Sequence, residues 1–287
     1  ADDYLAQARA SSGIKGREQA VIRLAKQSLE LRKSAEGFFL VGANKLFLGE
    51  YERGIVDLSK AIVLDSKDVN SFYNRGSAKY FLGDYLGAVS DLDRALELDP
   101  NDADAYYNRG HSKHDSGKPE SAILDYNNAI RLNPSHVNSY SNRGVASSSL
   151  GNTLGAMADF DKALQIDPKH SKTYFNRGNL KAALGDNQGA ISDYTEAIRI
   201  DPGFFQAYSN RGLSKSDLDD NKGAINDFDK ALEIDSDQAN LYFNRGLIMG
   251  KLNNIQGMCL DWKKAVLLGN QNALNALSKI KSSGFCY

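Results

Sequence analysis

Residues 69–102, VNSFYNRGSAKYFLGDYLGAVSDLDRALELDPND, recur along the chain in varied form every 34 residues. The tripeptide Asn-Arg-Gly marks the recurrences, at 74–76, 108–110, 142–144, 176–178, 210–212 and 244–246. One period upstream, residues 40–42 keep only the glycine. Seven units therefore begin at Ala35, Val69, Ala103, Val137, Ser171, Phe205 and Ala239. A fixed period of this length predicts a repeat array in which each unit packs against its neighbours.

Counted from 1 to 34, the positions within each unit predict two helices joined by a turn. Position 4 is aromatic and position 8 is glycine in every unit, and position 14 is leucine in six, a spacing that places these residues on one helix face. Position 15 is glycine in the first five units, which suits a left-handed helix end. Beyond it, alanine at position 27 and a large residue at position 24 indicate a second, closely packed helix. Proline ends four units, where it stops the helix.

This pattern resembles the tetratricopeptide repeat, and the resemblance covers residues 35–272. The Asn-Arg-Gly form is similar to repeats of cyanobacterial and plastid proteins. The resemblance implies an all-α fold, a right-handed superhelical solenoid of helix–turn–helix repeats. We expect a degenerate helical hairpin at 1–34, seven tandem units at 35–272, and a C-terminal capping helix and tail at 273–287. Polar terminal helices of this kind keep a repeat array soluble.

The same resemblance implies that the first helices line a concave groove that binds a partner segment. Position 6 faces this groove and carries a row of asparagines. They are Asn74, Asn108, Asn142, Asn176, Asn210 and Asn244. A carboxamide both donates and accepts, so such a row can hold the backbone of an extended peptide. The alternative is that these side chains hydrogen-bond neighbouring helices.

Aromatic residues at position 5 are candidates for the pockets of the same groove. They are Phe39, Tyr73, Tyr107, Phe175 and Phe243. The aromatic N-terminal half favours apolar anchors of a partner, unless the rings pack between adjacent helices instead. The carboxylate clamp by which this family holds the acidic tails of heat-shock chaperones needs lysine at position 5. No unit has lysine there, so we do not expect those tails as partners.

Charges at positions 7 and 23 predict a structural ladder. Position 7 is arginine in units 2 to 7, position 23 is aspartate in all seven units, and position 11 is lysine in five. Positions 7 and 11 lie one helical turn apart and face the second helix. We therefore expect partly buried Arg–Asp pairs that fix the register of the two helices. The alternative is a basic ligand-binding stripe.

The composition excludes several functional classes. Among 287 residues, 41% are hydrophobic, and no apolar run approaches the length of a membrane span. Residues 1–34 carry a net charge of +3 and 262–287 of +4, so 35–261 carry −8, which argues against nucleic-acid binding. Two cysteines are too few for a disulfide framework or a four-ligand zinc site, and Cys259 is expected to be a small buried hydrophobic residue.

The sequence also lacks the signatures of an enzyme. No phosphate-binding loop, H-E-x-x-H motif or nucleophile elbow is present, so we predict a chain that is not an enzyme, without catalytic residues or cofactors. His111, His114 and Asp115 lie within one helical turn, but without a matching pair we interpret them as polar surface rather than a metal site. The chain begins without Met. The expected location is cytoplasmic by default, with a plastid or exported mature form as alternatives.

These observations predict a scaffold that holds a protein or peptide partner in its groove, as an adaptor or assembly factor of a larger complex. Two alternatives stay open. The chain is a structural subunit or homo-oligomer that uses its outer face, or it is the substrate-recruiting part of an enzyme. Fold alone does not distinguish between these roles.

Overall fold

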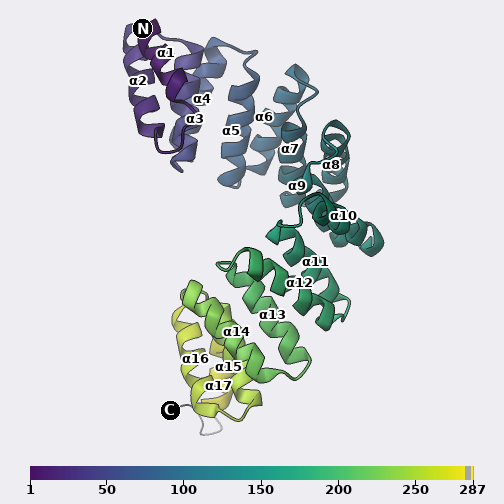
Figure 1. The fold of residues 1–287 in the computed structure, drawn as a ribbon. Helices are drawn as coiled ribbons and strands as arrows, with labels where there is room; N and C mark the ends of the chain where they lie inside the picture. Colours follow the sequence, from purple (N-terminus) through teal and green to yellow (C-terminus); the bar gives the residue numbers. More distant parts are fainter. Residues whose placement is uncertain (282–285, 287) are drawn as a thin grey trace. The chain divides into compact units, whose positions relative to one another are not determined.

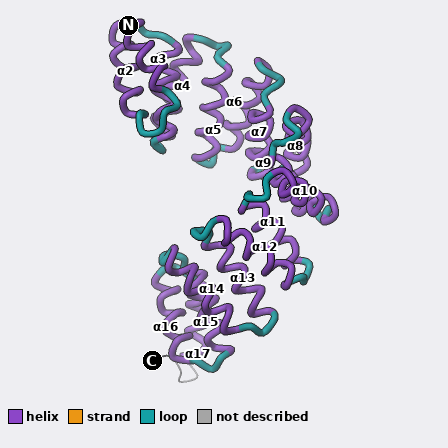
Figure 2. Tube along the Cα trace, viewed as in Figure 1, coloured by secondary structure: helices purple, strands orange, loops and turns teal. Residues whose placement is uncertain are grey.

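The computed structural model describes residues 1–281 and 286, and over these residues it contains seventeen helices and no strand. Figure 1 and Figure 2 show that they form successive hairpins. The first helices of the seven units are α3 (Ala35–Phe47), α5 (Val69–Phe81), α7 (Ala103–Asp115), α9 (Val137–Ser149), α11 (Ser171–Ala183), α13 (Phe205–Asp217) and α15 (Ala239–Lys251). The second helices are α4 (Tyr51–Leu64), α6 (Tyr85–Leu98), α8 (Pro119–Leu132), α10 (Thr153–Ile166), α12 (Asn187–Ile200), α14 (Asn221–Ile234) and α16 (Ile255–Leu267). Three further helices are α1 (Asp2–Ser11), α2 (Glu18–Leu31) and α17 (Gln271–Lys281).

The chain divides into two compact units, Ala1–Asn152 and Thr153–Tyr287. The boundary falls in the turn between α9 and α10. Within each unit the helices pack in chain order, because each second helix contacts the first helix of the next repeat as well as its own partner. The predicted all-α solenoid of helical hairpins is therefore confirmed.

The turn inside each repeat depends on one left-handed residue at position 15. Glycine occupies it in the first five repeats, with φ of 79° at Gly83 as an example. In the last two repeats Asp219 and Asn253 adopt φ of 62° instead. Asparagine and aspartate tolerate this region better than other non-glycine residues. The turn geometry is thus the same in all seven repeats although the glycine is not.

A capping side chain marks the beginning of the second helix immediately after this turn. Asp84 caps α6 by accepting a hydrogen bond from the Gly87 amide at 2.9 Å, and Asp186 caps α12 through Gly189 at 2.8 Å. Such a cap contributes about 1 kcal/mol by satisfying one of the helix's unpaired amides. The left-handed residue and the cap together fix where each hairpin turns.

Small residues at three positions let the two helices of a repeat approach closely. The alanines at positions 20 and 27, such as Ala88 and Ala95, have no exposed surface. At position 8, an added Cβ on Gly178 would lie 2.7 Å from the Tyr194 ring. The rings at position 24, including Phe160 and Tyr194, fill the remaining space and are almost fully buried. The core is therefore a series of small clusters, several of which join a second helix to the first helix of the next repeat.

A disulfide joins Cys259 of α16 to Cys286, with Cα atoms 5.3 Å apart. Both cysteines are buried, in a cluster with Trp262 and Leu277. The expectation that Cys259 serves only as a small hydrophobic residue is wrong, because it is covalently bonded across a separation of 27 residues. The predicted tail, 282–287, lies outside the described residues except for Cys286.

Candidate peptide-binding surface

The predicted site residues all lie on first helices, at positions 5 and 6 of their repeats. We call the surface formed by these positions the first-helix surface. Every one of the eleven side chains is half-buried rather than fully exposed. The reason is that each first helix lies beside the first helix of the neighbouring repeat within its unit, for example α5 beside α7 and α13 beside α15.

In repeat 3, Asn108 is tied to the preceding repeat. Its Nδ2 donates to the Tyr73 hydroxyl at 2.8 Å and lies 3.4 Å from the Ser77 hydroxyl, both on α5. In the next repeat Asn142 repeats the contact, because its Nδ2 donates to the Tyr107 hydroxyl at 3.3 Å. Position 6 of one repeat thus binds position 5 of the repeat before it.

In the second compact unit, Thr153–Tyr287, the asparagine has a different partner but again donates to the preceding repeat. Asn210 donates from Nδ2 to the Asn179 Oδ1 at 2.8 Å, and that same oxygen accepts from the Tyr194 hydroxyl at 2.8 Å. Asn179 occupies position 9 of the preceding repeat and so joins a core tyrosine to the row of asparagines. For Asn108 and Asn210, the carboxamide donor is engaged, whereas the oxygen has no hydrogen bond among those described.

Asn74 and Asn244 differ from this arrangement. Asn74 donates to the carbonyl of Asn70 in its own helix at 2.8 Å. Asn176 is half-buried on α11. The side chain of Asn244 makes no hydrogen bond within the part of the chain that the structure describes. The row is therefore regular in position but not in its hydrogen bonds.

The position-5 rings lie between adjacent helices and contact the core with one face. Phe39 packs against the cluster that includes Val41, and Tyr73 against the one that includes Leu92. The remaining three each contact the position-24 ring of their own repeat. The centroid distances are 6.1 Å for Tyr107–Tyr126, 5.9 Å for Phe175–Tyr194 and 5.9 Å for Phe243–Trp262. These rings are half-buried and hold fixed orientations through edge and offset contacts.

Burial moves the pKa of several tyrosines at or behind this surface further above neutral pH. It raises the pKa of Tyr73 to about 12, with Asp104 and Asp102 adding to the effect. Burial likewise raises the pKa of Tyr107, and it raises that of Tyr194, which lies behind the surface on α12, to about 12. At neutral pH these hydroxyls therefore stay neutral and take part in the hydrogen bonds described above.

Behind this surface, the predicted Arg–Asp ladder is confirmed. Arg109 binds Asp125 through two hydrogen bonds of 2.9 and 2.5 Å, and Lys113 approaches the same carboxylate at 2.7 Å. The aspartate is 3% exposed and the arginine 17%, so this is a nearly buried cluster. Equivalent pairs are Arg75–Asp91, Arg177–Asp193, Arg211–Asp227 and Arg245–Asp261. The alternative interpretation as a ligand-binding stripe loses its basis, because both cations are occupied by the aspartate.

Two further contacts of each arginine were missed by sequence reasoning. The guanidinium lies over the position-4 ring of its own helix, at 5.2 Å for Arg109 and Tyr106. It also bonds position 25 of the preceding second helix, where Asp93 accepts at 2.7 Å. Position 25 varies between Ser59, Asp93, Asn127, Asp161, Thr195 and Asp229, so no single residue type signals the contact. All six are polar, which is the signal that could have revealed it.

The histidine cluster of α7 forms hydrogen bonds with its neighbours. The Tyr80 hydroxyl donates to Asp115 at 2.5 Å and lies 3.1 Å from Nε2 of His111, while His114 lies 3.2 Å from the other Asp115 oxygen. Over residues 1–281 and 286, no group of three His, Cys, Asp or Glu is arranged to hold a metal ion. No helix among the described residues has both the length and the apolar character of a membrane span.

Four repeat models match the chain in overlapping or adjoining segments. The model described as TPR repeat matches 76–117, 178–216 and 216–253, and three described as Tetratricopeptide repeat match 103–136, 137–170 and 160–192. The chain is a tetratricopeptide-repeat protein. Members of this family are typically scaffolds for protein–protein interaction. No curated protein matches it in sequence.

Solved structures show the same fold as this tetratricopeptide-repeat protein. One is the crystal structure of the APC/C hetero-tetramer Cut9–Hcn1, with a TM-score of 0.70 and 17% identity over 96% of this chain. The chain spans 55% of the length of that match. Another is a tetratricopeptide repeat protein from Parabacteroides merdae, with a TM-score of 0.66 and 23% identity over 85% of this chain and 97% of that one. Identities this low support the shared fold alone.

Proposed function

We propose that this protein is a non-catalytic scaffold that binds an extended or helical segment of a partner protein on its first-helix surface. The role that fits is an adaptor or assembly factor of a larger complex. The observation that carries the proposal is that side chains of neighbouring repeats order one another: Asn108 donates to the Tyr73 hydroxyl across two first helices. A surface ordered before binding loses little conformational entropy when a partner arrives.

The chemistry of the surface suggests how a peptide would bind. Nδ2 of Asn108 and of Asn210 already donates to the preceding repeat, whereas each carboxamide oxygen has no hydrogen bond among those described and can accept from a backbone amide of a peptide. Tyr73 and Phe175 are half-buried against the core, so part of each ring remains available to an apolar side chain of a peptide. At about 1 kcal/mol for each net hydrogen bond, several such contacts correspond to weak or moderate affinity, and the rings would add selectivity.

A peptide-display experiment tests the proposal. Peptides of sixteen residues selected from a random library on the full chain would be titrated against variants by fluorescence anisotropy. Replacing Asn74, Asn108 and Asn142 by alanine should weaken binding by about tenfold or more. The matched control is Asn128→Ala on α8, because Asn128 also donates within its own helix, to Leu124. If the selected peptides bind the triple variant as tightly as the wild type, the asparagines are structural.

One observation favours a second function, as a structural subunit held through the outer face. Several second helices carry exposed apolar side chains, including Val63 at 84% and Leu154 at 86% exposure. Such residues are common singly on protein surfaces, so the outer face competes as a site only if they act together. Substituting Val63 and Leu154 by serine separates the two functions, because the outer-face function requires loss of partner or self-association while peptide binding is unchanged.

A further inference from the structure

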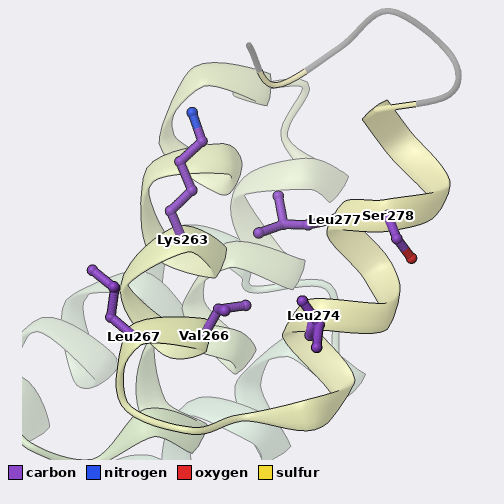
Figure 3. A pocket seen from close by; sticks show the side chains of 6 residues that line it. All are labelled: Lys263, Val266, Leu267, Leu274, Leu277 and Ser278. Atoms are coloured by element: carbon purple, nitrogen blue, oxygen red, sulfur yellow. The ribbon is translucent and has the colours of Figure 1, made fainter.

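On five second helices of the array, the side chain at position 26 is hydrogen-bonded to the one at position 29, at 2.6 to 3.5 Å. The pairs are Arg94–Glu97, Asn128–Arg131, Lys162–Gln165, Glu196–Arg199 and Lys230–Glu233. Repeats 1 and 7 have an apolar residue at position 29 instead, Val63 and Leu267. In repeat 7 this residue lies beside the last helix, because Figure 3 shows Leu267 of α16 and Leu274 of α17 around one cavity. In repeat 1 it lies near the position-4 ring, Phe38.

Repeat 1 also differs from the other repeats at position 7. In repeats 2 to 7 the arginine at that position lies over the position-4 ring, at 5.7 Å for Arg75 and Phe72. In repeat 1 position 7 is Val41, which is buried. The cation over the Phe38 ring is Lys60 of position 26, at 5.3 Å. A lysine of the second helix thus takes the place of the arginine of the first helix.

Beside these two changes, α3 and α4 border a cavity of about 520 Å³, which we call the repeat-1 pocket. It is lined by Lys33, Phe38, Ser59, Lys60, Val63 and Leu64. Three of these residues are apolar, and Val63 and Leu64 are 84% and 51% exposed. Two are lysines and none is acidic. The pocket therefore combines an accessible apolar surface with positive charge.

Neither lysine of the pocket has a close acidic partner of its own. The side chain of Lys60 is 53% exposed, and the carboxylate that it contacts, Asp57, lies 3.5 Å away. That carboxylate is bound more closely by Lys45, at 2.5 Å. Lys33 is exposed and forms no hydrogen bond or ion pair with the described residues. Both ammonium groups can therefore pair with an acidic ligand.

The corresponding cavity of repeat 2 provides an internal comparison. It has a volume of about 580 Å³, and its lining contains two arginines and three acidic side chains, a net charge of −1. Arg75 binds Asp91 at 2.6 Å, and Arg94 binds Glu97 at 2.7 Å. The cations of that cavity are thus paired within the repeat, whereas the lining of the repeat-1 pocket carries a charge of +2.

We propose that the repeat-1 pocket binds a segment of a partner protein in which an acidic side chain stands beside a large apolar one. The carboxylate pairs with Lys33 and Lys60, and the apolar side chain covers Val63. An anionic membrane surface fits less well, because Asp65, the residue after Leu64, is exposed and would meet headgroups of like charge. The pocket is separate from the first-helix surface, so the inference goes beyond the proposed function.

One substitution should close the pocket while preserving the fold. Val63→Glu gives Lys60 the position-29 partner that Lys230 has in Glu233 at 2.6 Å, and Val63 is exposed, so little packing is lost. A random library of sixteen-residue peptides would be selected on the full chain and counter-selected on this variant. We expect the retained peptides to share an acidic residue beside a large apolar one. In fluorescence anisotropy they should bind Val63→Glu about tenfold or more weakly than the wild type.

A double-mutant cycle tests whether the acidic residue of the peptide meets the lysines. Lys33→Met and Lys60→Met together keep unbranched side chains but remove both charges, and should weaken binding about tenfold or more. Changing the acidic residue of the peptide to its amide should have a similar effect on the wild type, but less than about a twofold effect on the double variant. The matched control is Lys230→Met, at position 26 of repeat 6, which should change the affinity less than about twofold. Circular dichroism would confirm that the variants remain folded.

Three results would overturn the inference. The first is a selection that yields no peptide whose binding Val63→Glu weakens. The second is an equal effect of the acid-to-amide change on the wild type and on the double lysine variant. The third is a different occupant, seen as binding to phosphatidylserine vesicles or as a dimer in sedimentation experiments that Val63→Glu abolishes. Replacing Asn74, Asn108 and Asn142 by alanine should leave binding of these peptides unchanged, so a failure here is distinguishable from a failure of the first-helix surface.

Discussion

Arg177 and Asp193 form a bidentate pair between α11 and α12, with hydrogen bonds of 2.9 and 2.7 Å. The pair with Asp193 and burial act on the arginine in opposite directions, and the pKa of Arg177 is raised because the hydrogen bonds prevail. Lys181 approaches the same carboxylate at 2.8 Å. The aspartate thus has two cationic partners. Three other repeats have the same three-residue cluster, centred on Asp91, Asp125 and Asp227, whereas the last repeat has only the pair of Arg245 and Asp261.

Removing one arginine of the ladder should destabilise the protein. Arg109→Leu leaves Asp125 buried with Lys113 as its remaining cation, so we expect a loss of about 2–3 kcal/mol, below the full cost of breaking a buried pair. Urea unfolding measures it. The control Arg94→Leu removes an exposed pair with Glu97 and should change stability by less than about 1 kcal/mol. Equal effects of the two substitutions would show that the ladder is not structural.

Position 8 offers a matched test of close helix packing. In Gly178→Ala the new methyl group would lie 2.7 Å from the Tyr194 ring, which is buried and held by Asn179, and we expect a loss of about 1–3 kcal/mol. In Gly212→Ala the nearest atom is 3.2 Å away. There the gain in helix propensity, about 1 kcal/mol, should offset the crowding. Thermal unfolding of both variants measures the difference in stability. A Gly178→Ala protein as stable as Gly212→Ala would contradict the expected cost of close packing.

Reducing the disulfide should loosen the C-terminal end. A loop of this length contributes about 3.5 kcal/mol in the chain-entropy model, so a reductant or Cys286→Ser should lower the stability of unit 2 by up to that amount. Unfolding followed by Trp262 fluorescence with and without dithiothreitol measures the change, since the indole lies in the same cluster. A Cys286→Ser variant serves as the control, because dithiothreitol should have no further effect on it.

Acid should lower the stability of the second compact unit, Thr153–Tyr287, through His170, the residue that precedes α11. Burial lowers the pKa of His170 below its usual value, and the Thr173 hydroxyl lies 2.7 Å from Nδ1. Below about pH 6.5, His170 therefore binds a proton more readily in the unfolded chain than in the folded chain. The contribution of His170 to stability is complete above that pH and is lost as the pH falls through the lowered pKa.

The control for this pH dependence is His170→Asn, because asparagine is favoured at the residue before a helix and does not titrate. Urea unfolding at pH 7.5 and pH 5 should show a smaller loss of stability for the variant than for the wild type. Identical losses in the two proteins would mean that His170 makes no contribution.

The sequence predicts the parts of this fold that repeat, and it fails where the repetition ends. The Arg–Asp ladder could be predicted because both partners keep their residue type in successive units, as in Arg75 and Asp91. The contact of the same arginine with position 25 could not, because Ser59, Asp93 and Asn127 share only polarity. The disulfide was missed because Cys286 lies outside the 34-residue period, so no positional rule pairs it with Cys259.

The candidate site could be predicted only in part. The period placed all eleven residues on first helices, but the hydrogen bonds of Asn108 and Asn210 depend on which side chain the neighbouring repeat offers at positions 5 and 9. The partner is Tyr73 for Asn108 and Asn179 for Asn210, and it depends on how adjacent repeats pack. The sequence therefore indicates where a partner could bind but not which groups remain available for it.

The variation at position 25 divides the array into pairs. Arg109, Arg177 and Arg245 reach back to an aspartate of the preceding repeat, whereas Arg75, Arg143 and Arg211 reach back to a neutral side chain. Nearest-neighbour coupling is therefore ionic between repeats 2 and 3, 4 and 5, and 6 and 7, and weaker between the pairs. Local opening should then proceed in blocks of two repeats, so amides of repeats 2 and 3 would exchange with solvent together. The cooperative element that we expect for this solenoid is a doublet of two repeats, twice the period that its sequence displays.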